Sequence, residues 1–365
     1  MPYTFMKGLE LSRLFYQEAV APILAAHFPD LAYAAARLDS GSDVLGFDTP
    51  RSMDHGWGPR LMLFLAEDDF DTLAGPIDQT LRAELPLEFR GFPTNFSPHE
   101  DKWMVPLEAG PVNHWVSLHT CRAFFIDYLR YDPDQALDPA TWLTFPQQRL
   151  RTVTVGPIFH AGLARLEAIR ARLSYYPPQL WLYLLANQWQ RISQEEAFVG
   201  RSGHAGDELG SRLIAARLIH DLMGLCFLLE RVYAPYAKWF GTAFAQLPGA
   251  AELTPLFQQA LSAQTWPERE QALSSAYELI AARHNRLGLT EPLPAKVSQF
   301  HSRPYLVIQA GDFAEAIRRT ITDPVILALP PHLGAIDQYV NSTDVLSDPA
   351  QFEQFRALYR PAGSA

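Results

Sequence analysis

Cysteine is scarce in this chain, with only Cys121 and Cys226 among 365 residues. Both lie in apolar surroundings, which predicts buried thiols and argues against a disulfide framework or a cysteine-based zinc site. No stretch is apolar over the roughly 18 residues that a membrane-spanning helix requires, and the N-terminus lacks the pattern of a signal peptide. These absences predict a cytoplasmic protein that does not cross a membrane.

Basic residues are also in the minority. The chain has 30 lysines and arginines against 40 acidic residues, which gives a formal net charge of −10. Broad binding of nucleic acid needs a basic surface, so this balance argues against it. A small pocket lined with arginine and Mg²⁺ is still compatible with such a charge.

Several reaction classes lack their motifs. The chain has no Walker loop, no G-x-G-x-x-G turn, no His-Glu-x-x-His pair and no G-x-S-x-G elbow. The 11 histidines are scattered, without the spacing of metal ligands. These observations argue against P-loop, dinucleotide-binding, zinc-protease and α/β-hydrolase chemistry.

What the chain does contain is a glycine-serine turn between two predicted strands. The apolar runs Leu31–Leu38 and Leu61–Ala66 predict short buried strands, and Gly41, Ser42 and Asp54 lie between them. Glycine lets a phosphate approach the backbone, backbone N–H groups and a serine hydroxyl can donate to it, and a carboxylate can hold Mg²⁺. The stretch therefore suits a metal-bound polyphosphate.

This arrangement resembles the nucleotidyltransferase superfamily, whose mark is a Gly-Ser or Gly-Gly pair followed by Asp-x-Asp or Asp-x-Glu on a strand. Asp54 matches the first acid, whereas Gly56 stands where the superfamily has the second. The longer run GSDVLGFD, followed by DHGWGPR, resembles uncharacterised bacterial proteins. These pair a nucleotidyltransferase-like N-terminal domain with a C-terminal domain of unknown function. The likeness extends from about Gly8 to about Asp348.

The periodicity and the resemblance together predict an α+β protein in two parts. Residues 1–135 are expected to form the nucleotidyltransferase-like mixed α/β domain. Residues 150–348 are expected to form a mainly helical bundle, followed by a tail at 349–365 that frays. Within the second part, short strands are expected at Pro304–Ile308 and Val325–Leu329.

In the first part, helices are expected at Gly8–Ala26, Asp69–Leu85 and Cys121–Tyr131. Further strands are expected at Leu87–Phe89 and Val112–Leu118. The alternation of helices and strands with short connections indicates a small mixed α/β layer.

The resemblance implies Mg²⁺-dependent transfer of a nucleotide, with AMP from ATP as the expected case, to a hydroxyl group. Gly41 and Ser42 would cradle phosphate, and Asp54 would bind metal and serve catalysis. Two cations in a partly dry site need more than one carboxylate, so Asp43 and Glu88 are the candidates for further metal ligands.

Each of these charged residues also has a plainer interpretation. Asp54 can be a turn or cap residue, and Asp43 can cap the backbone that follows the turn. Glu88 can be a solvated strand acid. Arg60, at the head of the second strand, can bind a phosphate bidentately or form an ordinary surface ion pair.

A glycine-rich run from Glu195 to Arg212 interrupts the helical pattern of the second part. The resemblance implies that this part supplies the acceptor pocket. Glu196 or Asp207 would be the general base, while Arg201 and Arg212 would hold phosphate. The alternative is that Asp207 caps a helix and the arginines pair with neighbouring acids.

Lys238 lies in the aromatic run Tyr233–Phe240. Such a run can stack a base while the lysine meets a phosphate, or it can be core packing between helix ends. Both interpretations remain open for this residue.

The sequence therefore predicts a nucleotidyltransferase that uses Mg²⁺ and ATP or another nucleoside triphosphate. Its acceptor would be a hydroxyl group on a small molecule or a macromolecule. The alternative is a non-catalytic nucleotide-binding or regulatory protein with a degenerate metal site. Gly56 favours the alternative, whereas Gly41, Ser42 and Asp54 favour the enzyme.

Overall fold

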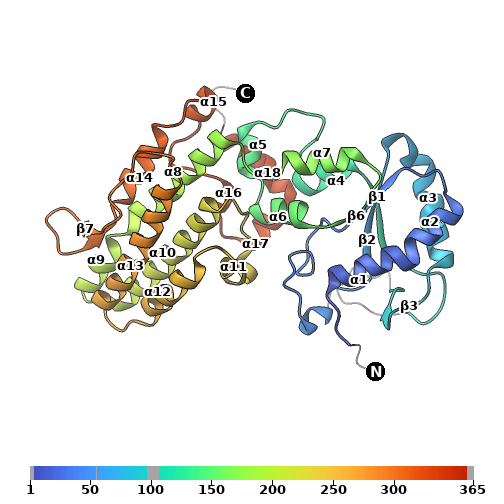
Figure 1. Cartoon of the computed structure of the whole chain (residues 1–365), viewed down its shortest axis with the longest axis horizontal. Coiled ribbons are helices and arrows are strands. Elements are labelled where there is room, and N and C mark those ends of the chain that lie inside the picture. The colour runs from blue at the N-terminus through green and yellow to red at the C-terminus, as the bar shows by residue number, and fades with distance from the viewer. Residues whose placement is uncertain (1–3, 55, 97–106, 360–365) are drawn as a thin grey trace. The chain divides into compact units, whose positions relative to one another are not determined.

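The computed structural model describes residues 4–54, 56–96 and 107–359. The chain divides into two compact units: residues 1–137 with 149–174, and residues 138–148 with 175–365. The chain thus leaves the first unit, contributes a short segment to the second, and then returns (elements labelled in Figure 1). Its class is α+β, as predicted.

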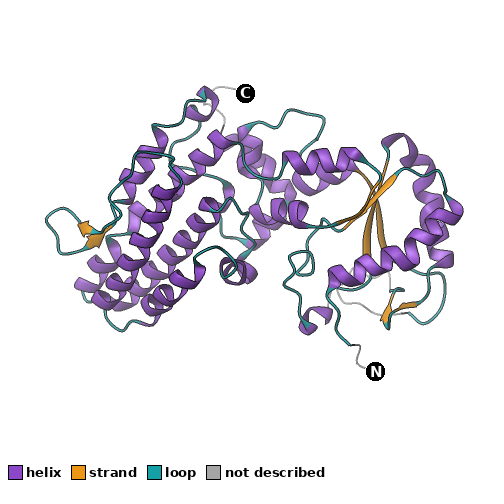
Figure 2. Ribbon diagram, in the orientation of Figure 1, coloured by secondary structure: helices purple, strands orange, loops and turns teal. Residues whose placement is uncertain are grey.

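A four-stranded sheet forms the centre of the first unit (Figure 2). Its strands are β1 (Tyr33–Ala36), β2 (Arg60–Leu65), β5 (Trp115–Thr120) and β6 (Ile158–Ala161), in the order β5-β2-β1-β6. β1 is antiparallel to β2 and β6, while β2 is parallel to β5. The strands predicted at β1, β2 and β5 are confirmed with shifted ends.

One face of this sheet carries the hydrophobic core of the first unit. Leu61, Leu63 and Leu65 alternate along β2 and are buried there. They pack with three helices, α1 (Gly8–Phe15), α2 (Ala21–His27) and α3 (Glu67–Glu84), and a π-helical turn at Tyr16–Val20 joins the first two. Apolar alternation along the strand therefore sets which face receives the helices.

The opposite face is covered in part by α4 (Cys121–Leu129) and α6 (Gln147–Val155). Phe64 of β2 meets Phe124 of α4 edge to face, with ring centroids 5.4 Å apart. The hydroxyl of Tyr128 lies 2.7 Å from Thr152 Oγ1 in α6.

The second unit is a helical bundle. Its longest helices are α8 (Pro178–Glu195), α10 (Glu208–Leu229), α12 (Ala250–Ser262) and α13 (Trp266–Arg286). α8 packs against α10 and α14 (Ala310–Arg318), where the buried Trp189 stacks on Phe313 at 4.4 Å between ring centroids. Shorter elements complete the unit: α5 (Pro139–Thr144), α9 (Phe198–His204), α11 (Ala237–Phe244), β7 (Ser298–Gln299), β8 (Leu306–Val307), α15 (Pro324–Leu327), α16 (Ile336–Tyr339), α17 (Thr343–Ser347) and α18 (Pro349–Arg356).

The domain boundary expected at residue 150 differs from the division in the structure. β6 and α7 (Ala164–Arg172) belong to the first unit. The physical reason is that β6 pairs along the free edge of β1, where Ala161 lies opposite Ala34. Short local periodicity does not reveal which distant strand a segment will pair with.

The strand predicted at Val325–Leu329 is wrong, because the chain forms the helix α15 there. The side chain of Asp323 accepts a hydrogen bond from the amide of Val325 at 2.8 Å. Pro324 occupies the first helical position, where its fixed φ and missing N–H are tolerated. Capping decided the structure of this short apolar run.

The tail expected to fray is instead folded as far as the description extends. α18 begins after Asp348, and Phe352 within it is fully buried. The hydroxyl of Tyr359 donates to the carbonyl of Gly334 at 2.8 Å. Burial of two aromatic side chains outweighs the polar composition of the segment.

Three glycines of the glycine-rich run lie inside helices, Gly210 among them in α10, although the run predicts a break. α9 passes through Gly200 and Gly203. A Cβ on Gly203 would lie 2.2 Å from the Cβ of Trp266, and one on Gly200 would lie 2.6 Å from the ring of Tyr305. These glycines therefore let α9 pack closely on its neighbours.

Gly203→Ala is expected to lower the free energy of unfolding of the second unit by about 1–3 kcal/mol, since the added methyl group overlaps the Trp266 side chain. Gly241→Ala in α11 is the matched control, because nothing lies within 4 Å of an added Cβ there. The control is expected to stabilise the helix by about 0.5–1 kcal/mol. Urea unfolding measures both variants, and equal responses would contradict the close packing at Gly203.

Candidate functional site

The predicted nucleotide site falls on the loop that joins β1 to β2. Gly41 and Ser42 begin a turn in which the amide of Phe47 donates to the Ser42 carbonyl at 2.8 Å. A 3₁₀ turn, η2 (Pro50–Asp54), follows, and β2 begins only at Arg60. The exposed Asp54 therefore lies outside the strand on which the resemblance places it.

Two arginines and two aspartates form a charge network beside this turn: Arg37, Asp39, Asp43 and Arg60. Arg37 is 1% exposed and pairs with both Asp39 and Asp43, its Nη2 lying 3.0 Å from Asp43 Oδ2. Arg60 Nη2 lies 3.1 Å from Asp39 Oδ2. Burial alone would raise the pKa of Asp43, but Arg37 and Arg60 outweigh burial and hold that pKa below its usual value.

The Asp43 carboxylate folds back over Gly41. A Cβ on Gly41 would lie 2.0 Å from Asp43 Oδ1. Glycine is therefore required at this position by a carboxylate of the chain itself. Because Asp43 is buried and paired with Arg37, it serves the charge network in this arrangement rather than an open metal site.

Sequence reasoning does not single out Asp48, a second buried aspartate of the loop. Its Oδ2 accepts from the amide of Gly8 at 2.7 Å and from Trp57 Nε1 at 3.1 Å. Lys7 Nζ lies 3.3 Å from its Oδ1. Asp48 thus ties the loop to the start of α1.

Arg37 and Asp39 were also missed, although Arg37 carried a signal. It is the single charged residue inside the apolar run Leu31–Leu38. A charge within a buried strand predicts a buried partner of opposite sign. No comparable pattern marks Asp48, whose setting is that of an ordinary turn residue.

Glu88 lies apart from the four-stranded sheet. It belongs to β3 (Glu88–Phe89), which pairs with β4 (Phe92–Pro93) in a separate hairpin, and its side chain is exposed. Across the described ranges of the chain, no group of three or more His, Cys, Asp and Glu side chains is placed to hold a metal ion. The described acids do not fit the two-metal site that the resemblance implies.

In the second unit, Glu196 is buried next to the start of α14. Its Oε2 accepts from the amide of Ile308 at 2.8 Å and its Oε1 from the amide of Ala310 at 3.0 Å. Burial raises its pKa to about 7, although these backbone amides oppose the rise. Such a pKa suits a general base, but both oxygens already accept hydrogen bonds from the backbone.

Asp207 is the N-cap of α10, since its Oδ1 accepts from the amide of Gly210 at 2.7 Å. The capping interpretation of this residue is therefore confirmed. The three predicted basic residues of this unit each contact a neighbour: Arg212 donates to Gln264 Oε1 at 3.0 Å, Arg201 lies 5.1 Å from the ring centroid of Phe198, and Lys238 lies 5.0 Å from that of Trp239.

The predicted site residues thus fall into two sets, one in each unit. The first set is Gly41, Ser42, Asp43, Asp54, Arg60 and Glu88; the second is Glu196, Arg201, Asp207, Arg212 and Lys238. Within the first set, the charge network brings Asp43 and Arg60 together, whereas Glu88 stands on its own hairpin.

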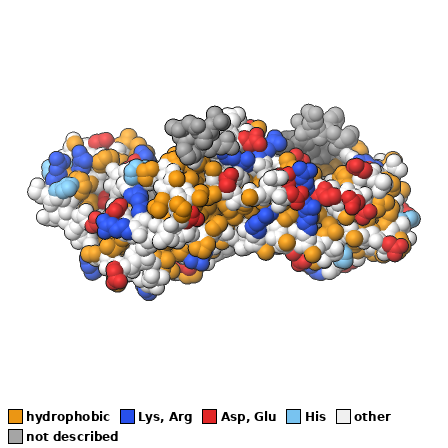
Figure 3. Space-filling model, turned by 90° about the horizontal axis from the view of Figure 1, so that it is seen from above, with side chains coloured by type: hydrophobic (Ala, Val, Ile, Leu, Met, Phe, Trp, Pro, Cys, Tyr) orange, Lys and Arg blue, Asp and Glu red, His pale blue; other side chains and the backbone are white. Residues whose placement is uncertain are grey.

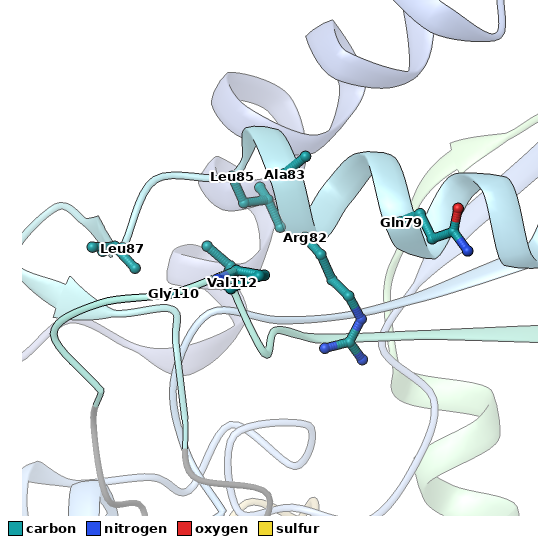
Figure 4. Close-up of a pocket in the computed structure, with 8 residues that line it drawn as sticks. Gln79, Arg82, Ala83, Leu85, Leu87, Gly110 and Val112 are labelled. Atoms are coloured by element: carbon teal, nitrogen blue, oxygen red, sulfur yellow. The ribbon is translucent and has the colours of Figure 1, made fainter.

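A cavity of about 600 Å³ lies elsewhere in the first unit, beside the end of α3 (Figure 4). Its lining includes Arg82, Leu85, Leu87 and Val112. The guanidinium of Arg82 is already bound to Asp78, with Nε 2.6 Å from Oδ2. None of the predicted site residues lines this cavity.

The surface carries charges of both signs. On the face shown in Figure 3, basic and acidic side chains are interspersed, with hydrophobic side chains between them. Within the part of the chain that is described, no helix combines the length and the apolar character needed to cross a bilayer.

A family model described as "Domain of unknown function (DUF4037)" matches residues 142–240. This segment runs from α5 into α11 and includes parts of both units. This segment is therefore similar to an uncharacterised family, which agrees in part with the resemblance seen in the sequence. No curated protein and no solved structure matches the chain, and these comparisons give no support to the nucleotidyltransferase part of the resemblance.

Asp43→Asn is expected to destabilise the first unit by about 3–5 kcal/mol, because it leaves the buried Arg37 short of a counter-charge. Asp30→Asn is the control, since this exposed site should change stability by no more than about 0.5 kcal/mol. Urea unfolding, followed by hydrogen exchange of β1 and β2 amides, measures both.

The same pair of proteins has an expected pH dependence. The folded pKa of Asp43 lies below its usual 3.8, so its stabilisation is present above pH 3.8 and is lost as pH falls through the folded value. The difference in the free energy of unfolding between wild type and Asp43→Asn should therefore persist from neutral pH down to about 4. A gap that closes between pH 5 and 7 would argue against the ion pair.

Glu196 gives a pH dependence of opposite sign in the second unit. Its folded pKa of about 7 exceeds the usual 4.5, so proton binding stabilises the fold below pH 4.5 and this contribution disappears as pH rises through 7. Between pH 5 and 8 the wild type should lose about 2–3 kcal/mol relative to Glu196→Gln. Urea midpoints of both proteins test this, and parallel pH profiles would contradict the buried acid.

Proposed function

We propose that the first unit binds a nucleoside triphosphate beside Arg60. It does so on a nucleotidyltransferase-like arrangement of strands that no longer supports two-metal transfer. The observation behind the loss of two-metal transfer is the dispersal of the acids. Asp43 forms an ion pair with Arg37, and Glu88 lies in a separate hairpin. Asp54 lies in the turn η2, before β2 begins.

The order and pairing of the elements support nucleotide binding. The Gly41-Ser42 turn follows β1 closely, and Arg60 opens β2 next to the parallel strand β5. Backbone N–H groups of a tight turn together with a guanidinium are groups that recognise phosphate. The likeness to nucleotidyltransferases lies in the order of the strands and the turn. Phosphate recognition itself depends on Arg60.

Arg60 donates to Asp39 and to the carbonyl of Gly56, and it can exchange Asp39 for a phosphate without leaving a buried charge behind. Its side chain is 18% exposed and that of Asp39 is 30% exposed. Asp39 also accepts a hydrogen bond from Arg37. When a phosphate replaces Asp39 as the partner of Arg60, Asp39 can therefore keep its ion pair with Arg37. A planar guanidinium then binds two phosphate oxygens at once.

Transfer of the nucleotide to a hydroxyl acceptor is the second candidate function. The exposed position of Asp54, after the Gly41-Ser42 turn, favours it. Gly56 and the dispersal of the other acids count against it.

Calorimetric titration with ATP, with and without Mg²⁺, tests the binding proposal. Arg60→Ala is expected to weaken ATP binding about 10- to 100-fold, because it removes charge-assisted hydrogen bonds. Arg60→Lys keeps the charge and should recover part of the loss. Arg51→Ala, an exposed arginine of the same loop, and Asp54→Asn are expected to bind as the wild type does.

Release of pyrophosphate from labelled ATP in the presence of metabolite extracts separates the two functions. No release is expected. Mg²⁺-dependent release that Asp54→Asn abolishes would overturn the proposal in favour of transfer. Failure of the wild type to bind ATP would remove both functions.

A further inference from the structure

Two polar side chains of β5, Ser117 and His119, lie on the sheet face opposite α1–α3, which α4 and α6 cover in part. β5 is an edge strand, and its residues Trp115, Ser117 and His119 pair with Arg60, Met62 and Phe64 of β2. Residues paired directly across two strands share a face. Ser117 is therefore a diagonal neighbour of Arg60 on the same side of the sheet.

Ser117 and His119 are joined by a hydrogen bond of 2.9 Å between Oγ and Nε2. Ser117 is exposed and His119 is half-buried. A longer contact, 3.5 Å, links Ser117 Oγ to the carbonyl of Leu61, which is at the limit for a hydroxyl hydrogen bond. The hydroxyl can therefore turn outward while the imidazole holds its oxygen.

The imidazole of His119 is fixed by aromatic rings on two sides. Its centroid lies 5.7 Å from that of Phe64 on β2 and 5.7 Å from that of Phe124 on α4. The rings restrict the imidazole to the orientation that meets Ser117. The Ser117–His119 pair is thus organised before any ligand arrives.

Charged groups near His119 come from two elements. Asp39 lies in the loop after β1 and Asp127 on α4. Arg60 is linked to them through its ion pair with Asp39. Burial lowers the pKa of His119 below its usual 6.5, although Asp39 and Asp127 act to raise it. A dianionic ligand on Ser117 would act in the same direction as these carboxylates and favour the imidazolium.

We infer that Ser117, His119 and Arg60 form a phosphate subsite at the edge strand β5, next to the start of β2 and where Ser117 is exposed. The Ser117 hydroxyl donates to a phosphoryl oxygen, Arg60 donates to the same group, and His119 positions the hydroxyl and adds charge when protonated. The subsite takes the terminal phosphates of a nucleotide. The inference rests on the proposed function in placing phosphate beside Arg60, but it names residues on β5 that neither the turn nor the predicted acids include.

Titration of the full chain with pyrophosphate and with ATP tests the subsite. Ser117→Ala and His119→Gln are each expected to weaken the binding of both ligands about 3- to 10-fold. This corresponds to the loss of one hydrogen bond. His160→Gln, an exposed histidine of β6, is the matched control and should bind as the wild type does.

The pH dependence gives a second readout. Wild-type affinity for pyrophosphate should rise as pH falls from 7.5 to 5.5. The pKa of His119 lies below 6.5, so the imidazole gains its positive charge in the acidic part of this range. Part of this change in affinity comes from protonation of pyrophosphate itself. The remaining part should be absent in His119→Gln. Retention of the full slope would overturn the role of His119.

The two proposals can fail separately. If Ser117→Ala and His119→Gln bind pyrophosphate as tightly as the wild type while Arg60→Ala binds weakly, the subsite is wrong and nucleotide binding beside Arg60 survives. If Arg60→Ala also binds as the wild type does, the proposed function fails with it.

Discussion

The buried guanidinium of Arg37 is the constraint on which the first unit depends. A charge closed off from water must be neutralised and hydrogen-bonded, or its desolvation outweighs the rest of the fold. Asp39 and Asp43 supply the counter-charge from the segment directly after β1. Their positions fix the course of the loop, and the Asp43 carboxylate that lies against Gly41 follows from the same ion pair. Asp39 then links this buried pair to the partly exposed Arg60. The position of Arg60 in the candidate nucleotide site therefore depends on the same ion pairs that neutralise Arg37.

The first unit is discontinuous in sequence for an equally physical reason. β1 would be an edge strand without β6, and an exposed edge leaves backbone donors and acceptors unpaired. The segment 149–174 returns to supply β6 and α7. Residues 138–148, which come before it, are built into the second unit instead, where the amide of Gln147 donates to Asp337 at 3.0 Å. The segment 142–240, which the model of an uncharacterised family matches, therefore includes residues from both units.

Residues that look catalytic in the second unit have structural partners in the fold. Glu196 satisfies amides at the start of α14, and Asp207 satisfies an amide at the start of α10. Helix starts leave N–H groups without partners in the helix, and carboxylates are the preferred acceptors for them. Two of the glycines between the acids allow close packing, since Gly203 admits the side chain of Trp266 and Gly200 the ring of Tyr305, while Gly206 adopts a positive φ of 86°. A run of acids and glycines between two helices therefore needs no ligand to account for it.

The sequence by itself determined the elements whose signal is local. Alternating or continuous apolar residues marked β1, β2 and β5, and helical periodicity marked α3 and the helical character of the second unit, because burial imposes the period of the element on the chain. Capping side chains could have predicted α15, whose start carries Asp323 and Pro324. Only the tertiary structure decided which acids meet which arginines, that β6 joins the first unit, and that Phe352 and Tyr359 hold the C-terminal segment. These outcomes depend on partners far apart in sequence, and the free energy of burying a charge or an aromatic ring is fixed only when those partners come together.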